Sequence, residues 1–196
     1  MSENSKNFDR ERLYKECQEI KKIVIGNDLG KKIDPMYKKI GEAYNNVYDD
    51  KYSKYLCMYL TLQQIHKSFH WLSRGPSFYG DHELFQRLYL DVTEEIDFLA
   101  EKLIGLFGRQ CVNPVYLSKV VYENMSSLLE SFNVNCDPDD LIGIALYFEM
   151  LFLEINNSFF KDLDESGTIT MGLDDLIMAN HSKHENNLYL LKSRFE

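Results

Sequence analysis

One long helical pattern limits what this chain can fold into more than any other feature. Residues 79–107 contain no proline, and their apolar side chains recur every three or four positions, as on an α-helix with one buried face. The members of this stripe are Phe85, Leu88, Tyr89, Val92, Ile96, Leu99, Leu103 and Phe107. The segment is therefore predicted to form one helix that packs against other helices.

Four polar side chains on and beside this segment have the chemistry of a metal site. His70 and His82 flank a Gly-Pro break, and Asp97 and Glu101 follow, four residues apart. Residues i and i+4 share a helix face, so the two carboxylates project together. Imidazole and carboxylate ligands together suit iron, zinc or manganese. An ordinary solvated face is the other interpretation, and spacing by itself leaves both open.

The distance between these residues adds a second constraint. His82 and Asp97 are 15 residues apart, which is roughly 22 Å along a helix that rises about 1.5 Å per residue. One ion cannot contact both side chains in the same chain. A shared site therefore needs His70 and His82 from one chain and Asp97 and Glu101 from another, so a metal site predicts an oligomer. The apolar neighbours of the carboxylates, Leu90 and Ile104, also favour a subunit interface.

Composition indicates an all-α protein with one main domain. The chain of 196 residues is 44% hydrophobic and has only four prolines and ten glycines. It has no apolar run of about 18 residues, so no membrane span is expected, and no basic-then-apolar leader. The four cysteines lack CxxC spacing, which is typical of reduced thiols in a cytoplasmic protein.

Charge is distributed unevenly along the chain. The net charge is −9, but residues 1–40 carry ten Lys and Arg against seven Asp and Glu, and residues 41–196 carry twelve against twenty-four. An acidic body repels nucleic acid and attracts cations. The basic residues of the first segment are interleaved with acids, which disfavours a DNA-binding arm.

The order of the predicted elements is that of a four-helix bundle with a long crossover. Residues 1–50 are expected to be an extension with a disordered tip, a helix at 8–24 and another from Pro35 onward, and residues 51–196 are expected to be the bundle domain. The predicted core helices are residues 52–73, 79–107, about 138–161 and about 173–192, with a shorter helix at 116–129. Asp137-Pro138 is a strong helix start, because Asp caps and Pro occupies the first turn.

These motifs resemble those of the Dps family, the mini-ferritins. The family pattern His-Trp, Gly-Pro-x-Phe, His-Glu-x-Phe and Asp-x-x-Ala-Glu is matched here by His70-Trp71, Gly75-Pro76-Ser77-Phe78, His82-Glu83-Leu84-Phe85 and Asp97-Phe98-Leu99-Ala100-Glu101. The key residues follow at the family's intervals of 12, 15 and 4. The last helix is also similar, with Tyr189 in place of Trp. The resemblance covers roughly residues 45–195.

The resemblance implies a ferritin-like four-helix bundle that assembles into a hollow shell of twelve subunits. In this family ferrous iron binds at inter-subunit ferroxidase sites on the two-fold axes. It is oxidised there, preferentially by hydrogen peroxide, and ferric mineral collects inside. His70, His82, Asp97 and Glu101 are then the catalytic ligands of Fe(II), with zinc as a possible substitute.

Several alternatives stay open at this point. The same shell could compact DNA without enzymatic activity, or bind zinc as an inert structure. Ferritins with the whole site inside one bundle use Glu-x-x-His motifs, and this sequence has none. His66 shares the face of His70, but a histidine on a core helix is more often structural. A cluster before the last helix is a candidate for a cation pore and consists of Asp162, Asp164, Glu165, Asp174 and Asp175.

Overall fold

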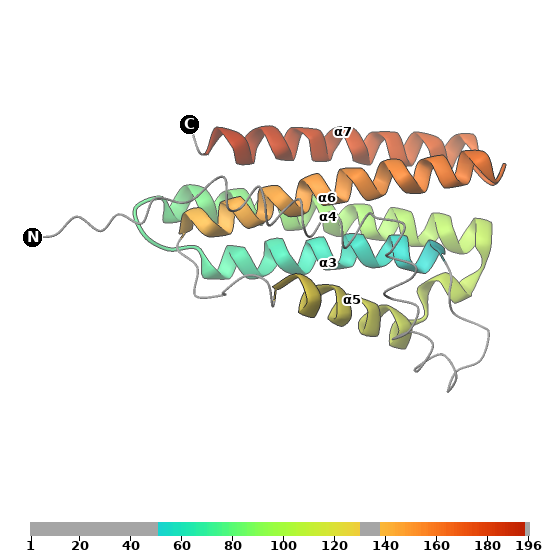
Figure 1. The fold of residues 1–196 in the computed structure, drawn as a ribbon, viewed down its shortest axis with the longest axis horizontal. Helices are drawn as coiled ribbons and strands as arrows, with labels where there is room; N and C mark the ends of the chain where they lie inside the picture. Colours follow the sequence, from blue (N-terminus) through green and yellow to red (C-terminus); the bar gives the residue numbers. More distant parts are fainter. Residues whose placement is uncertain (1–50, 130–137, 195–196) are drawn as a thin grey trace, which may run out of the picture. The chain divides into compact units, whose positions relative to one another are not determined.

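The computed structural model describes residues 51–129 and 138–194, and every regular element within them is a helix. These elements are α3 (Lys51–Leu72), α4 (Phe78–Phe107), the short 3-10 helix η1 (Arg109–Val112), α5 (Pro114–Leu129), α6 (Pro138–Glu165) and α7 (Met171–Ser193) (Figure 1). The predicted all-α class is confirmed. The long helix predicted for residues 79–107 is present as the uninterrupted helix α4. The structure extends α6 one turn beyond the predicted end at residue 161.

The four long helices pack as a bundle. α3 contacts α4, α5 and α6, and α7 contacts α6 and α4. The chain colours in Figure 1 show α4 and α6 running in one direction and α3 and α7 in the other. The crossover with α5 therefore lets α6 run parallel to α4 instead of forming a hairpin with it, as in bundles of this connectivity.

The core follows the apolar stripe predicted for α4. Five of its members, Phe85, Leu88, Val92, Leu99 and Leu103, have no exposed surface. Full burial of one such side chain stabilises the folded state by about 1.5–3 kcal/mol relative to leaving that side chain exposed. Leu72, the last residue of α3, is 40% exposed, because the chain turns away from the bundle there.

Local signals at the helix ends explain where the elements begin and stop. The side chain of Asn113 accepts hydrogen bonds of 3.1 Å from the amides of Val115 and Tyr116 at the start of α5. Thr170 caps α7 by accepting from the amide of Leu173 at 3.2 Å. Gly108 ends α4 with a φ of 102°, a backbone angle that favours glycine.

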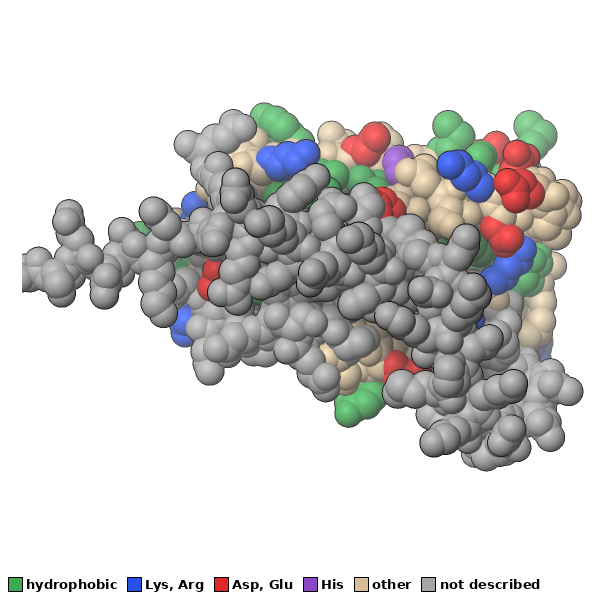
Figure 2. Space-filling view, in the orientation of Figure 1, with side chains coloured by type: hydrophobic (Ala, Val, Ile, Leu, Met, Phe, Trp, Pro, Cys, Tyr) green, Lys and Arg blue, Asp and Glu red, His purple; other side chains and the backbone are tan. Residues whose placement is uncertain are grey.

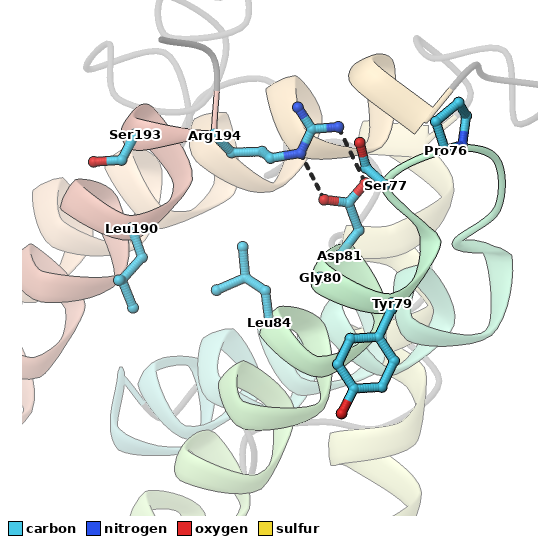
Figure 3. Close-up of a pocket in the computed structure, with 9 residues that line it drawn as sticks. All are labelled: Pro76, Ser77, Tyr79, Gly80, Asp81, Leu84, Leu190, Ser193 and Arg194. Carbon is cyan, nitrogen blue, oxygen red and sulfur yellow. Dashed lines mark hydrogen bonds and ion pairs between the residues drawn. The ribbon is translucent and has the colours of Figure 1, made fainter.

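The end of α7 is tied to the beginning of α4. The guanidinium of Arg194 donates to the buried carboxylate of Asp81 at 2.7 and 3.3 Å. Figure 3 shows this ion pair at the edge of an open pocket that Tyr79, Leu84 and other side chains line. This ion pair connects the end of α7 to the first turns of α4. Because its two charges compensate each other, the pair attracts a charged ligand only weakly.

The extension at residues 1–50, its two helices and the cap at Asp137 lie outside the described residues, so the domain division stays a prediction. No described helix is long and apolar enough to cross a membrane. The thiols of Cys57 and Cys111 are buried and reduced, and burial raises the pKa of Cys57 to about 12, which makes its thiol unreactive.

Candidate metal centre

The turn between α3 and α4 brings His70 and His82 together. Their ring centroids are 3.7 Å apart and the ring planes differ by 25°. The ring of Tyr89 packs edge-on to that of His70, and the ring centroids of Phe78 and His82 are 5.0 Å apart. Only 9% of His70 is exposed, and His82 is half-buried. The pair is therefore one compact unit formed by residues twelve positions apart.

The backbone fixes which nitrogen of each ring carries hydrogen. Nδ1 of His70 is 2.9 Å from the carbonyl oxygen of His82, and Nδ1 of His82 is 2.9 Å from that of His70. A carbonyl oxygen only accepts hydrogen bonds, so each Nδ1 is the donor. In a ring with its single hydrogen on Nδ1, Nε2 keeps its lone pair. Histidines that bind metals are held in this way, with the second nitrogen donating to an oxygen.

The carboxylates of Asp97 and Glu101 lie on the same helix as His82 but far along it. Both are exposed and α4 is continuous between them and His82, so the separation of roughly 22 Å expected from the helical rise stands. Among the described residues, no group of three or more His, Cys, Asp or Glu is arranged to hold a metal ion. One chain therefore offers two separated half-sites, and their role as metal ligands stays a prediction.

Large apolar side chains are exposed around the two half-sites. Trp71 follows His70, Phe98 follows Asp97, and both are about two-thirds exposed, at 66% and 64%. Tyr79 and Leu90 on α4 are exposed as well. Apolar side chains grouped on a protein surface mark interaction sites. Each half-site thus has exposed apolar neighbours along the chain, as is expected where a surface contacts another chain.

Curated relatives match much of this chain, although no family model matches it. General stress protein 20U of Bacillus subtilis is 30% identical over 127 residues, which is 64% of this chain and 81% of that protein. DNA protection during starvation protein 2, a Dps protein of Bacillus anthracis, is 25% identical over 126 residues, again 81% of that protein. The chain belongs to the Dps family. A Brevibacillus brevis protein named DNA protection during starvation protein is 42% identical over 41 residues, 28% of its length.

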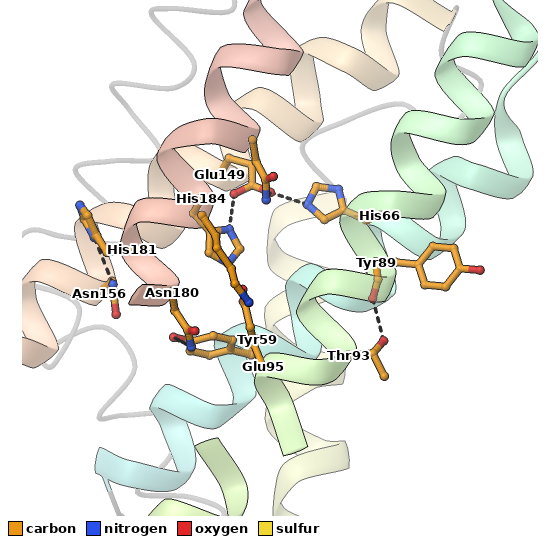
Figure 4. Close-up of polar contacts among 12 residues, drawn as sticks. Tyr59, His66, Tyr89, Thr93, Glu95, Glu149, Asn156, Asn180, His181 and His184 are labelled. Atoms are coloured by element: carbon orange, nitrogen blue, oxygen red, sulfur yellow. Dashed lines mark hydrogen bonds and ion pairs between the residues drawn. The ribbon is translucent and has the colours of Figure 1, made fainter. Parts of the chain in front are cut away.

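The interior of this Dps-family protein holds a second group of polar residues. His66, Glu95, Glu149 and His184 come from α3, α4, α6 and α7, one from each, and none is more than 2% exposed. Figure 4 shows Glu149 between the two histidine rings. Its Oε1 is 2.8 Å from Nε2 of His66, and its Oε2 is 2.5 Å from Nδ1 of His184. His66 thus takes no part in the His70–His82 pair.

The carboxylates determine the ionisation of this cluster. Nε2 of His184 is 2.9 Å from Oε2 of Glu95, so both nitrogens of the ring donate to carboxylates. Burial would lower the pKa of His184, but the charges and hydrogen bonds of Glu149 and Glu95 outweigh burial and raise it to about 10. Burial would raise the pKa of Glu149, but His184 and His66 lower it to about 2. His184 is therefore an imidazolium at neutral pH.

Sequence reasoning singled out neither Glu95, Glu149 nor His184. Two signals in the sequence point to Glu149 and His184. Glu149 interrupts the apolar run of α6, and its neighbours on the same face, Ala145 and Phe152, are buried. In α7 three buried polar residues follow at helical spacing between the buried apolar residues Ile177 and Leu191: Asn180, His184 and Asn187. A polar side chain at a predicted core position is a reason to expect a buried network.

The acidic residues of the proposed pore lie around the turn between α6 and α7. Asp162 pairs with Lys51 at 2.7 Å, and Asp174 lies in the first turn of α7, where a negative charge stabilises the helix. An ion pair and a helix end within one chain therefore explain the positions of two of the five acidic residues. A pore would need further chains, so that role remains a prediction. Figure 2 shows acidic, basic and apolar side chains interspersed along α7 on the face that it presents.

Proposed function

We propose that this protein oxidises ferrous iron at sites shared by two chains, uses hydrogen peroxide as the oxidant, and stores the ferric product inside a shell of such chains in the cytoplasm. The observation that carries this proposal is the His70–His82 pair. Both rings are held by the backbone with Nε2 available, as ligands of a metal require. Membership of the Dps family supports the same function.

The two half-sites supply complementary ligands. One chain contributes the imidazoles of His70 and His82, and the other contributes the carboxylates of Asp97 and Glu101. Nitrogen and oxygen ligands with open positions suit Fe(II) and leave room for an oxidant. Two ferrous ions supply the two electrons that, with two protons, convert hydrogen peroxide into two molecules of water. The reaction removes ferrous iron and peroxide together.

A complementation experiment tests whether two chains share the site. The variant His70→Ala/His82→Ala and the variant Asp97→Ala/Glu101→Ala are each expected to lose fast peroxide-dependent oxidation, followed as ferric absorbance after anaerobic loading with ferrous iron. Co-expressed and purified together, they form mixed pairs in which one of the two sites has all four ligands. Recovery of up to half of the wild-type rate in mixed pairs is the expected result.

A control separates loss of the site from damage to the fold. Asp91 is a partly exposed carboxylate on α4 that pairs with Arg87 at 3.7 Å, and surface pairs of this kind contribute little to stability. Asp91→Ala should oxidise iron at the wild-type rate. Fast oxidation that survives in Asp97→Ala/Glu101→Ala, or mixed pairs as slow as the separate variants, would contradict the shared site.

The relatives named for DNA protection raise the question of DNA contact. We propose that protection here comes from removal of iron and peroxide, because residues 41–196 carry twelve Lys and Arg against twenty-four Asp and Glu. Such a surface repels phosphate groups. A gel shift with duplex DNA that persists from low to moderate salt would instead favour a DNA-compacting shell.

A further inference from the structure

One continuous series of hydrogen bonds joins the four long helices inside the bundle. It is formed by the buried cluster of His66, Glu95, Glu149 and His184. Glu149 on α6 connects His66 on α3, at 2.8 Å, with His184 on α7, at 2.5 Å. His184 in turn donates to Glu95 on α4 at 2.9 Å. Hydrogen bonds to charged groups are short and directional, whereas apolar contacts are not directional, so this series restricts how the helices can rotate and slide.

Glu95 occupies a core position of α4. It lies between Val92 and Leu99 at helical spacing, and all three side chains are buried. Ile96, which the apolar pattern predicts for this turn, is only half-buried. Oε1 of Glu95 lies 3.3 Å from Nζ of Lys183, and its Oε2 belongs to the series described above. Both oxygens of the carboxylate are therefore held in place.

The buried cluster adjoins both proposed half-sites along the chain. On α3, His66 comes four residues before His70, and residues four apart share a helix face. On α4, Glu95 comes two residues before Asp97, so the two side chains project about 200° apart at about 100° per residue. The rotation of α4 that buries Glu95 therefore directs Asp97 away from the core, and Asp97 is exposed. The contacts of the cluster thus determine where side chains of both half-sites project.

Stability does not account for the buried cluster. Ionised groups lose their hydration in a protein interior, and apolar side chains of similar size often stabilise a core as well or better. Nδ1 of His66 is also buried without a hydrogen-bond partner, which costs free energy. A binding site, in contrast, needs its side chains held to within about 0.5 Å. Apolar residues of about the right size specify positions less narrowly, so a directional cluster beside the half-sites suits this need.

We propose that the buried cluster positions the ligands of the site between chains. Glu95 sets the rotation of α4 that directs Asp97 and Glu101 toward a second chain, and His66 sets the rotation of α3 at His70. The members of the cluster are positioning residues, because they act through these ligands and do not contact the iron. This role rests on the proposed function and extends it to the interior of the bundle.

Replacement of the whole cluster by leucine separates position from stability. The variant His66→Leu/Glu95→Leu/Glu149→Leu/His184→Leu removes every charge of the cluster together, so its Tm should equal or exceed that of the wild type. In anaerobic equilibrium dialysis we expect it to bind Co²⁺, a probe for the ferrous ion, at least tenfold more weakly than the wild type. Peroxide-dependent oxidation of ferrous iron should be at least tenfold slower. If the cluster only stabilised the fold, affinity and rate would follow Tm.

Two single variants decide the question where the fourfold variant fails to fold. Glu95→Ala removes the contact with His184, and Glu95→Gln keeps a side-chain oxygen that can accept from it. Both are measured at a temperature at which circular dichroism shows native helix content. Glu95→Ala should weaken Co²⁺ binding and raise the KM for ferrous iron at least fivefold, whereas Glu95→Gln should stay within twofold of the wild type. Asn180→Leu is the control, because this buried residue of α7 donates to Tyr59 at 3.3 Å, and it should match the wild type.

Comparison of the wild type with Asp97→Ala/Glu101→Ala keeps the positioning role distinct from the proposed function. Fast oxidation that only the wild type shows supports the site between chains. Given that result, wild-type affinity and rate in the folded fourfold variant, or equal effects of Glu95→Ala and Glu95→Gln, would overturn the positioning role and leave the proposed function intact. Equally slow oxidation in the wild type and in Asp97→Ala/Glu101→Ala would overturn both.

Discussion

The ionisation of His184 is determined by the two carboxylates that lie on either side of its ring. Its pKa in the folded protein is about 10, against an ordinary value of 6.5. A group with a raised pKa stabilises the fold fully below its unfolded pKa, and this contribution disappears as the pH rises toward the folded value. The window for this loss is therefore pH 6.5 to 10. For Glu149, with a pKa lowered to about 2 from 4.5, the contribution disappears as the pH falls from 4.5 to 2.

This ionisation predicts the pH dependence of stability for the metal-free protein. Wild-type Tm should fall between pH 6.5 and 10 by more than that of His184→Gln, whose neutral side chain cannot lose a proton. At pH 7 the variant should be less stable by on the order of 3–5 kcal/mol, because a buried ion pair is broken. Thermal melts across this range measure both effects. Parallel curves for the two proteins would show that His184 is not charged at neutral pH.

At the scale of a single element, α4 depends on how it ends. Gly108 has a φ of 102°, and its amide donates to the carbonyl of Ile104 at 3.0 Å. A Cβ at this position would lie 2.5 Å from the side chain of Gln110. Gly105 lies within α4, and a Cβ there would meet nothing within 4 Å. The backbone at Gly108 therefore requires glycine, whereas Gly105 has room for a side chain.

A pair of substitutions tests these roles. Gly108→Ala should lower the free energy of unfolding by about 1–3 kcal/mol, because a residue with a Cβ is strained at this φ. Gly105→Ala should raise it by about 0.5–1 kcal/mol, because alanine loses less backbone entropy in a helix. Urea unfolding measures both. A destabilised Gly105→Ala with unchanged Gly108→Ala would contradict the helix end described here.

At the scale of the whole molecule, we expect the surface around the proposed half-sites to mediate association of the chains. Leu90 lies two turns before Asp97 on α4 and is 47% exposed, although it is apolar. A second chain that covers this surface would bury Leu90 and bring its own histidines toward the carboxylates. The same contact would complete the proposed iron site and remove apolar surface from water.

The variant Leu90→Asp tests this contact. It should weaken association of the chains at least tenfold, because a charge enters an apolar interface, while the helix content of each chain stays unchanged. Sedimentation velocity and circular dichroism measure the two properties. Tyr122→Asp places the same charge at a residue of α5 that is 72% exposed and should leave this contact intact. Unchanged sedimentation of Leu90→Asp would exclude the α4 surface as the interface.

The sequence by itself determined the features of this protein that depend on neighbours along the chain. Helical periodicity predicted α4 and its buried stripe, because the period of apolar residues reports local geometry. The short Gly75-Pro76 turn explains why His70 and His82 meet. The 15 residues between His82 and Asp97 already placed these side chains too far apart for one ion.

Only the tertiary structure decided which side chains meet inside the bundle. Glu149 is 83 residues from His66 and 35 residues from His184, and periodicity shows only that such positions face a core. The residue that a core position contacts on another helix depends on how the helices cross and on their relative height. The hydrogen-bond partners of each imidazole, and hence the tautomers of His70 and His82 and the charge of His184, follow from that packing and not from local sequence.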